Sequence, residues 1–123
     1  MCMMRAYKKM RHAWNGLLII FRAESSFRFQ VACALFLVAI LFGLPIEAWE
    51  RAILFTVALL VLVVESLNTA GERILDMVQP RWKEEVGVVK DMLAGSVLLV
   101  AVGACILGVI ILGPSILHMV SRV

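Results

Sequence analysis

The sequence predicts an all-α integral membrane protein, in which three transmembrane helices follow an N-terminal amphipathic helix on the membrane surface. Hydrophobic residues make up 63% of the 123 residues, against about half in a typical soluble domain. Three apolar stretches approach the length of about 20 residues that a spanning helix needs: Phe29–Leu44, Ala52–Ala70 and Met92–Leu112. We therefore expect a single membrane domain over residues 1–123.

Residues 1–27 have the pattern of the amphipathic helix. Apolar side chains recur every three or four residues, with basic and polar ones between them. The apolar positions are Tyr7, Met10, Trp14, Leu17, Leu18 and Phe21, and the polar ones are Lys8, Lys9, Arg11, Asn15 and Arg22. Such a helix lies on the inner leaflet, either as a plain anchor or as part of a site. Glu24 is the exception, because an acidic residue does not serve anchoring there.

The predicted spans are residues 29–49, 52–71 and 91–113, and the second continues as a cytoplasmic helix to about residue 80. The first apolar stretch is short, so it must borrow either Phe27–Gln30 or Ile46–Trp49 to reach span length. Gly43 and Pro45 are expected to end its helix, with Trp49 at the membrane interface.

Lysine and arginine are distributed unevenly along the chain. Six precede the first span, one lies between the first and second, four lie between the second and third, and one is in the tail. Cytoplasmic segments of membrane proteins carry an excess of these residues. The N-terminus and the loop over residues 72–91 are therefore expected in the cytoplasm, which holds ATP.

A stripe of polar residues runs along the second span and out of the membrane. At about 100° per residue, four polar side chains fall within about 60° of Glu65 and extend about 16 Å along the helix. They are Asn68, Thr69, Glu72 and Asp76. Asn68 and Thr69 alone would fit interhelical hydrogen bonding. A carboxylate at membrane depth costs about 2.5–3.5 kcal/mol, so we interpret Glu65 as a general base or a proton carrier.

A second charged cluster, "KEEVGVVKD", precedes the third span. Glu84 and Glu85 fit a solvated loop. Lys90 and Asp91 lie where the third helix is expected to begin, so a phosphate there would meet both a lysine and a helix N-terminus. Asp91 could equally cap that helix.

Several kinds of site are absent from the sequence. It contains no P-loop, Rossmann glycine pattern, nucleophile elbow or HExxH zinc motif. Its three cysteines are far apart, which argues against a disulfide framework, and His12 and His118 are isolated. Carboxylates and a lysine remain, and this set suits Mg²⁺ bridging to the phosphates of ATP.

Two blocks of sequence, "ESLNTAGERILD" and "KDMLAGS", closely resemble the signature of the prokaryotic diacylglycerol kinase family. The upstream "ESSFR" resembles the E-x-x-F-R element of the same family. The resemblance covers about residues 5–112. It implies a homotrimer in the bacterial inner membrane, with sites shared between subunits, that transfers the γ-phosphoryl group of MgATP to the hydroxyl of diacylglycerol.

The resemblance also implies roles for individual residues. Glu65 matches the general base and Asn68 a polar residue lining the site. Glu24 and Glu72 match the Mg²⁺ ligands. The residues that match the nucleotide side are Arg5, Asp76, Lys90 and Asp91, together with the two metal ligands.

Some positions depart from the family pattern. Gly71 stands where an aliphatic residue is usual, which is expected to loosen the helix or to open space beside Glu72. Gln30 replaces a Glu, and His12 with Ala13 replaces a Tyr-Ser pair of enterobacterial members, so contacts to adenine are not carried over there.

Three other functions fit parts of the sequence. Undecaprenol kinases of the same family often carry His-Pro in the loop before K-D, and the loop here, "QPRWKEEVGVVKD", favours diacylglycerol. A small proton-coupled transporter would use Glu65 but would not need Lys90 and Asp91. If the protein were a non-catalytic scaffold, the polar stripe would have no explanation.

Overall fold

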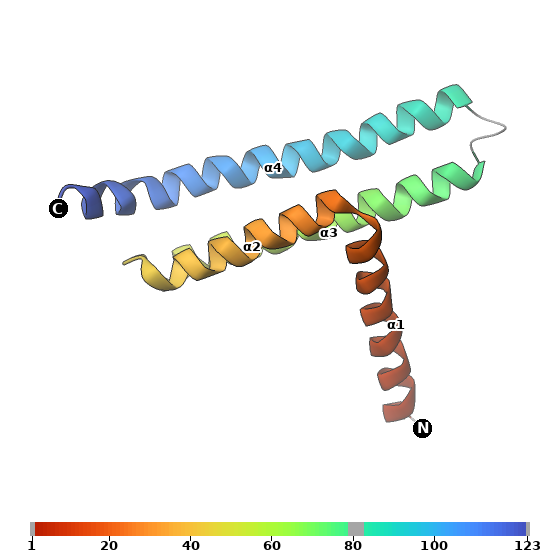
Figure 1. Ribbon diagram of the computed structural model, residues 1–123, viewed down its shortest axis with the longest axis horizontal. Helices are drawn as coiled ribbons and strands as arrows, with labels where there is room; N and C mark the ends of the chain where they lie inside the picture. Colours follow the sequence, from red (N-terminus) through yellow and green to blue (C-terminus); the bar gives the residue numbers. More distant parts are fainter. Residues whose placement is uncertain (1, 79–82, 123) are drawn as a thin grey trace.

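The computed structural model describes residues 2–78 and 83–122. Within these residues the chain forms four α-helices and no strand, which confirms the all-α expectation. Helices α2, α3 and α4 run roughly parallel, and α1 leaves the start of α2 beside the middle of α3 and points away from them (Figure 1). The bounds are Cys2–Ala23 for α1, Ser25–Gly43 for α2, Ala48–Val78 for α3 and Lys83–Val120 for α4.

Three of these helices, α2, α3 and α4, are long and apolar enough to cross a membrane. This confirms the expected number of spans. Large apolar side chains face outward along them, with 69% of Phe36, 80% of Phe42 and 76% of Leu99 exposed. An apolar surface of this extent is suited to lipid or to a second chain.

Helix α2 lies earlier in the chain than the range 29–49 expected for the first span. It begins at Ser25 and ends at Gly43, so the extra length comes from the N-terminal side. Leu44 is extended, with φ −95° and ψ 144°, because the ring of Pro45 disfavours a helical conformation in the residue before it. The segment 44–47 is therefore a loop rather than the end of a span.

Helix α3 is a continuous helix of 31 residues. At 1.5 Å per residue it is about 46 Å long, which exceeds the roughly 30 Å of a hydrocarbon core. It contains the expected span 52–71 and an extension to Val78. The last residues of the expected extension, 79–80, lie outside the described residues.

Helix α4 begins at Lys83, eight residues before the expected start of the third span at residue 91, and continues seven residues past the expected end at residue 113. The expectation that Lys90 and Asp91 lie at the helix N-terminus, with Asp91 as a possible cap, is therefore wrong, and Glu84 and Glu85 lie in the first turn of α4 rather than in a loop.

Helix α4 has 38 residues, reaches Val120 and contains Pro114 in its interior. A proline removes one backbone hydrogen bond and bends a helix, but membrane helices tolerate it where neighbouring groups or local adjustments satisfy the backbone.

The apolar core is small and lies at the end of the bundle away from α1. Leu41 of α2, Ile46 of the loop, Leu54 of α3 and Ile111 of α4 are buried together there. Helix α3 contacts each of the other three helices. Residues on α3 are therefore well placed to meet side chains from the rest of the chain.

Candidate active site

The polar stripe on α3 changes from buried to exposed along its length. Glu65 is 5% exposed and Thr69 is 4% exposed, and they are the buried polar residues of the described chain. Asn68 and Glu72 are half-buried, and Asp76 is exposed. The stripe therefore leads from a buried carboxylate to a surface carboxylate, as the helical spacing predicts.

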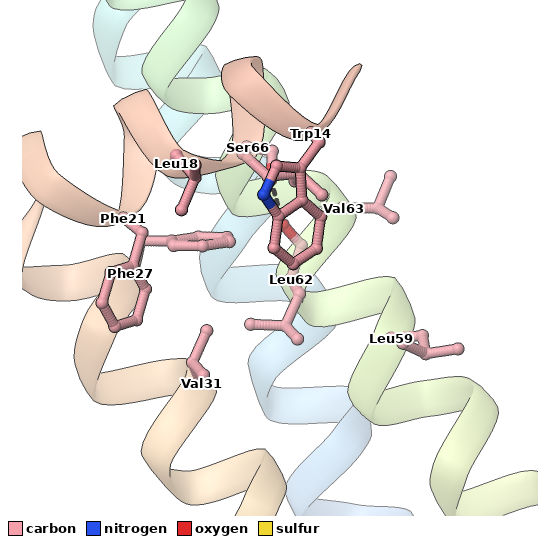
Figure 2. A pocket seen from close by; sticks show the side chains of 10 residues that line it. Trp14, Leu18, Phe21, Phe27, Val31, Leu59, Leu62, Val63 and Ser66 are labelled. Carbon is pink, nitrogen blue, oxygen red and sulfur yellow. Dashed lines mark hydrogen bonds between the residues drawn. The ribbon is translucent and has the colours of Figure 1, made fainter. Parts of the chain in front are cut away.

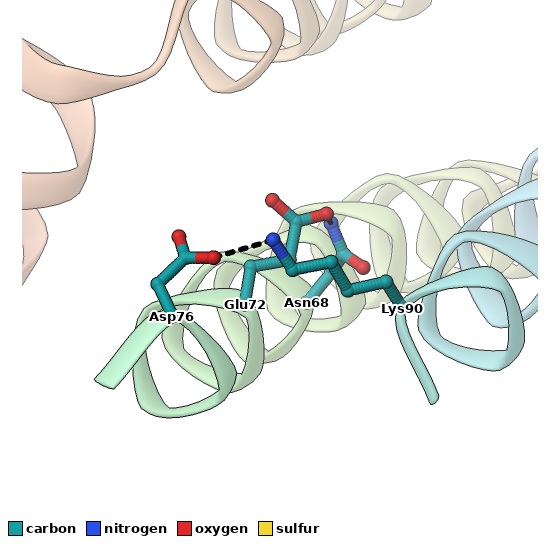
Figure 3. Close-up of polar contacts among 4 residues, drawn as sticks. All are labelled: Asn68, Glu72, Asp76 and Lys90. Carbon is teal, nitrogen blue, oxygen red and sulfur yellow. Dashed lines mark hydrogen bonds and ion pairs between the residues drawn. The ribbon is translucent and has the colours of Figure 1, made fainter. Parts of the chain in front are cut away.

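The middle of the stripe holds an internal hydrogen bond. Asn68 Nδ2 donates to Glu72 Oε1 at 3.2 Å, and Figure 3 shows the two side chains beside each other along α3. Asn68 Oδ1 is buried and has no hydrogen-bond partner among the described residues. A buried acceptor without a donor is costly, so this oxygen is ready to bind an incoming donor or cation.

Glu65 is bound by a side chain from another helix. Ser26 Oγ, near the start of α2, donates a hydrogen bond to Glu65 Oε1. Ser26 is two residues after Glu24, so this contact brings the junction of α1 and α2 next to the stripe. Sequence reasoning missed Ser26, because nothing in the spacing of "ESSFR" indicates which helix the serine will face.

The junction of α1 and α2 is a sharp bend at Glu24. Its backbone is extended, with φ −112° and ψ 118°, and its side chain does not cap α2. The Arg28 guanidinium reaches back and donates from Nη1 to the carbonyl oxygens of Phe21 and Arg22, each at 3.1 Å. A cation at the C-terminus of a helix satisfies free carbonyls and interacts favourably with the helix dipole.

Helices α3 and α4 are joined at the exposed end of the stripe. Lys90 Nζ lies 2.5 Å from Asp76 Oδ1, and Figure 3 shows the lysine reaching across from α4. The two side chains are 32% and 55% exposed, and solvent-exposed pairs contribute only about 0–1 kcal/mol to stability. The main effect of the pair is therefore to hold the Lys90 ammonium in place, and its contribution to stability is small.

Two expected nucleotide-side residues do not join this cluster. Asp91 is exposed on α4, and Arg5 is exposed near the start of α1. The N-terminal end of α1 points away from the three long helices (Figure 1). The chain therefore does not bring its own Arg5 to its own stripe.

The donor atoms at the stripe fit a hard divalent cation. The described residues contain no group of three or more His, Cys, Asp or Glu side chains arranged around a metal. Mg²⁺ needs only one or two protein carboxylates when phosphates and water complete its shell. Glu72 and the unpartnered Asn68 Oδ1 are oxygen donors of the kind that it binds. Among the described residues no hydrogen bond or ion pair joins the side chain of Glu24 to them, so its role as a metal ligand stays a prediction.

An apolar cavity of about 420 Å³ lies between α1, α2 and α3 (Figure 2). Its lining includes the aromatic side chains Trp14, Phe21 and Phe27. The remaining lining residues are Leu17, Leu18, Val31, Leu59, Leu62, Val63 and Ser66. Phe27 and Ser66, which line the cavity, are the chain neighbours of Ser26 and Glu65, which are not themselves part of the lining.

The structure corrects the expectation that Gly71 opens space beside Glu72. A Cβ atom at Gly71 would lie 2.8 Å from Leu93 Cδ1 and 3.4 Å from Leu93 Cδ2. These distances are shorter than normal carbon–carbon contacts of about 3.5–4.0 Å. The leucine of α4 already fills that space, so the missing side chain allows close packing of α3 against α4.

Comparison with known proteins supports the reading of the two sequence blocks. The sequence model described as prokaryotic diacylglycerol kinase matches residues 11–112. A diacylglycerol kinase of Synechocystis is 34% identical over 89% of this chain and 63% of its own length. A diacylglycerol kinase of Escherichia coli is 32% identical over 88% of each chain.

An undecaprenol kinase of Bacillus subtilis is also similar, with 32% identity over 91% of each chain. The match to the family model covers most of the chain, and it includes the polar stripe, the bend at Glu24 and the Lys90–Asp76 pair. The resemblance seen in the sequence is thereby confirmed, and the chain belongs to the prokaryotic diacylglycerol kinase family.

Proposed function

We propose that this protein is an ATP-dependent lipid kinase that phosphorylates the primary hydroxyl of diacylglycerol at the cytoplasmic leaflet and forms phosphatidic acid. One observation carries the proposal. A buried carboxylate, Glu65, begins a polar stripe that leads to the surface, and the residue after it, Ser66, lines an apolar cavity. That arrangement suits an enzyme whose acceptor comes from the membrane and whose donor comes from water.

The cavity supports a place for the lipid substrate. Its lining is almost entirely apolar, and about 25 cal/mol is gained per Å² of apolar surface that binding removes from water. An acyl chain lying between Trp14, Phe27 and Leu62 would leave the glycerol end near Glu65. The hydroxyl of the lipid would then face the polar stripe.

Glu65 is the general base of the proposed reaction. As the lipid oxygen attacks the γ-phosphorus, Glu65 takes the hydroxyl proton, a new oxygen–phosphorus bond forms, and the bond from phosphorus to the β–γ bridging oxygen breaks. The leaving group is ADP. Alignment of the two reactants and electrostatic stabilisation supply most of the rate in phosphoryl transfers of this kind.

The phosphates of ATP would lie along the stripe between Glu72 and Lys90. Glu24 and Glu72 would hold Mg²⁺, with Asn68 lining the site, and bound Mg²⁺ would offset the negative charge of the phosphates. Lys90 would contact a phosphate, with Asp76 orienting its ammonium group. Asp91 would contribute on the nucleotide side from the next position of α4.

We propose a homotrimer with shared sites, which would explain the position of Arg5. The start of α1 points away from the bundle of its own chain (Figure 1), so Arg5 would reach the nucleotide of a neighbouring subunit. The apolar faces of α1, which include Met10 at 71% and Trp14 at 63% exposed, would rest on the inner leaflet. The excess of Lys and Arg supports a cytoplasmic N-terminus and 72–91 loop in the bacterial inner membrane.

Undecaprenol is the second candidate acceptor, because the Bacillus subtilis relative of that name is as similar as the Escherichia coli one. The loop of this chain lacks the His-Pro pair and favours diacylglycerol. Purified protein with radiolabelled MgATP should transfer label to diacylglycerol vesicles faster than to undecaprenol vesicles. Label on neither lipid, together with proton-driven transport in vesicles, would replace the kinase proposal with a transporter that uses Glu65.

A further inference from the structure

The hydrogen bond between Ser26 and Glu65 connects two helices at the buried end of the stripe. Ser26 lies in the first turn of α2, and Glu65 lies near the middle of α3. Among the described residues it is the only hydrogen bond recorded for the Glu65 carboxylate. The second carboxylate oxygen, Oε2, therefore has no donor among residues 2–78 and 83–122.

The Ser26 hydroxyl does not form the hydrogen bond that a serine near the start of a helix usually forms. Serine near a helix start commonly bonds to the backbone of its own first turn. The N-cap of α2 is Glu24, whose side chain makes no cap bond, and Ser26 donates to α3 instead. Ser25, one position earlier, is exposed as Ser26 is, but it makes no side-chain hydrogen bond with any described residue.

The backbone at Ser26 is held by the two residues that follow it. Phe27 is 5% exposed and packs at the cavity, and Arg28 binds the last carbonyls of α1. These contacts keep the start of α2 against α3. The Ser26 hydroxyl is therefore kept within reach of Glu65, although Ser26 itself is exposed.

A glutamate side chain has three rotatable bonds, so a base on such a side chain must be held in the reactive geometry. Hydrogen bonds to an ionised acceptor are roughly twice as strong as neutral ones. A donor on Oε1 holds the carboxylate and leaves the lone pairs of Oε2 for the substrate proton. The contact thus supplies orientation without occupying the reacting oxygen.

We infer that Ser26 is a positioning residue for Glu65, which holds the carboxylate so that Oε2 faces the acceptor hydroxyl of the lipid. The inference rests on the proposed kinase function. It predicts that Ser26 acts on the chemical step and acts only through Glu65, and that it makes no contact with either substrate.

The test compares Ser26→Ala, Ser26→Thr and the matched control Ser25→Ala in the purified full-length protein. Ser26→Ala should lower kcat by about tenfold, with the KM values for diacylglycerol and MgATP within twofold of the original. Ser26→Thr keeps the hydroxyl and should recover most of kcat. Ser25→Ala should match the unaltered protein.

A variant of Glu65 distinguishes two roles for Ser26, namely orienting the Glu65 carboxylate and simply packing α2 against α3. Glu65→Asp withdraws the carboxylate from α2 by one methylene, so Ser26→Ala should cause no further loss of kcat in that background. Equal losses in both backgrounds would overturn the inference, as would a Ser26→Ala protein with unchanged kcat or a Ser26→Thr protein no better than Ser26→Ala. If the unaltered protein phosphorylates no lipid, the proposed function itself fails, which is a different outcome from an active enzyme that is indifferent to Ser26.

Discussion

Lys90 Nζ and Asp76 Oδ1 lie 2.5 Å apart and connect α4 to α3 at the surface end of the polar stripe. Both side chains are partly exposed, so the pair adds little to stability. The pair matters for position, because it holds the Lys90 ammonium, the phosphate contact that we propose, beside α3.

The first prediction concerns this pair. Asp76→Asn should raise the KM for MgATP by up to about fivefold, which corresponds to about 1 kcal/mol of lost preorganisation. The midpoint of thermal unfolding should hardly move. Glu84→Gln, which neutralises an exposed carboxylate in the first turn of α4, is the control and should leave the KM unchanged. An Asp76→Asn enzyme with normal KM would mean that Lys90 needs no orientation.

The second prediction addresses the base. Glu65→Gln should lower kcat for diacylglycerol by about 10²-fold or more, because an amide cannot accept the hydroxyl proton. The amide oxygen can still accept the hydrogen bond from Ser26, so ATP binding and assembly should survive. Radiometric kinase assays and nucleotide-binding titrations measure the two effects. Glu50→Gln, at the other end of α3, is the matched control, and near-normal kcat in Glu65→Gln would exclude Glu65 as the base.

The third prediction tests the metal ligand on the stripe. Glu72→Gln should shift the Mg²⁺ concentration at half-maximal activity severalfold upward, because a carboxylate ligand becomes a neutral one. Mg²⁺ titrations at fixed ATP measure the shift, and removal of Mg²⁺ with a chelator should abolish activity in both proteins. An unchanged titration curve would remove Glu72 from the metal site.

The fourth prediction tests the cavity. Val31→Trp should fill part of its volume and raise the KM for diacylglycerol while leaving the KM for MgATP unchanged. Ala32→Trp adds the same side chain at the next, exposed position of α2 and should have little effect. Kinetics with diacylglycerols of different chain length would show the effect most clearly. Equal KM values for both tryptophan variants would place the acyl chain elsewhere.

The fifth prediction follows from the contact between Gly71 and Leu93. Gly71→Ala should be close to neutral, because the gain of about 1 kcal/mol in helix propensity offsets a displacement at the flexible end of the leucine. Gly71→Leu should cost about 1–3 kcal/mol through overpacking. Thermal unfolding in detergent, followed by circular dichroism, measures both. The double variant Gly71→Leu with Leu93→Ala should regain most of the loss, and its failure to do so would show that Leu93 is not the obstacle.

Much of this architecture is predictable from the sequence because a bilayer imposes strong constraints. Runs of apolar residues near 20 in length indicated three spanning helices, and the 3.6-residue period placed Glu65, Asn68, Glu72 and Asp76 on one face of α3. The roles of these residues came from the family resemblance. Those roles stay predictions.

The features that were missed depend on how helices pair in space. Ser26 is distinguished by its hydrogen bond to Glu65, and Arg28 by its hydrogen bonds to the carbonyls that end α1. Nothing in the sequence around these two residues indicates those partners. The reason for Gly71 likewise lies on α4, in the side chain of Leu93. No periodicity within one helix contains that information.

The length of α3 gives the protein a built-in sensitivity to its membrane. Glu65 is 13 residues beyond Ala52, where the expected span begins, which places it about 20 Å along the axis. In a hydrocarbon core of about 30 Å, an upright helix that enters the core at Ala52 puts this carboxylate about 10 Å short of the other boundary. A thinner bilayer would bring Glu65 closer to the headgroups, and a thicker one would submerge it further, unless the helix tilts. We therefore expect the acyl-chain composition of the host membrane to affect whether Glu65, the proposed base, can reach a lipid hydroxyl.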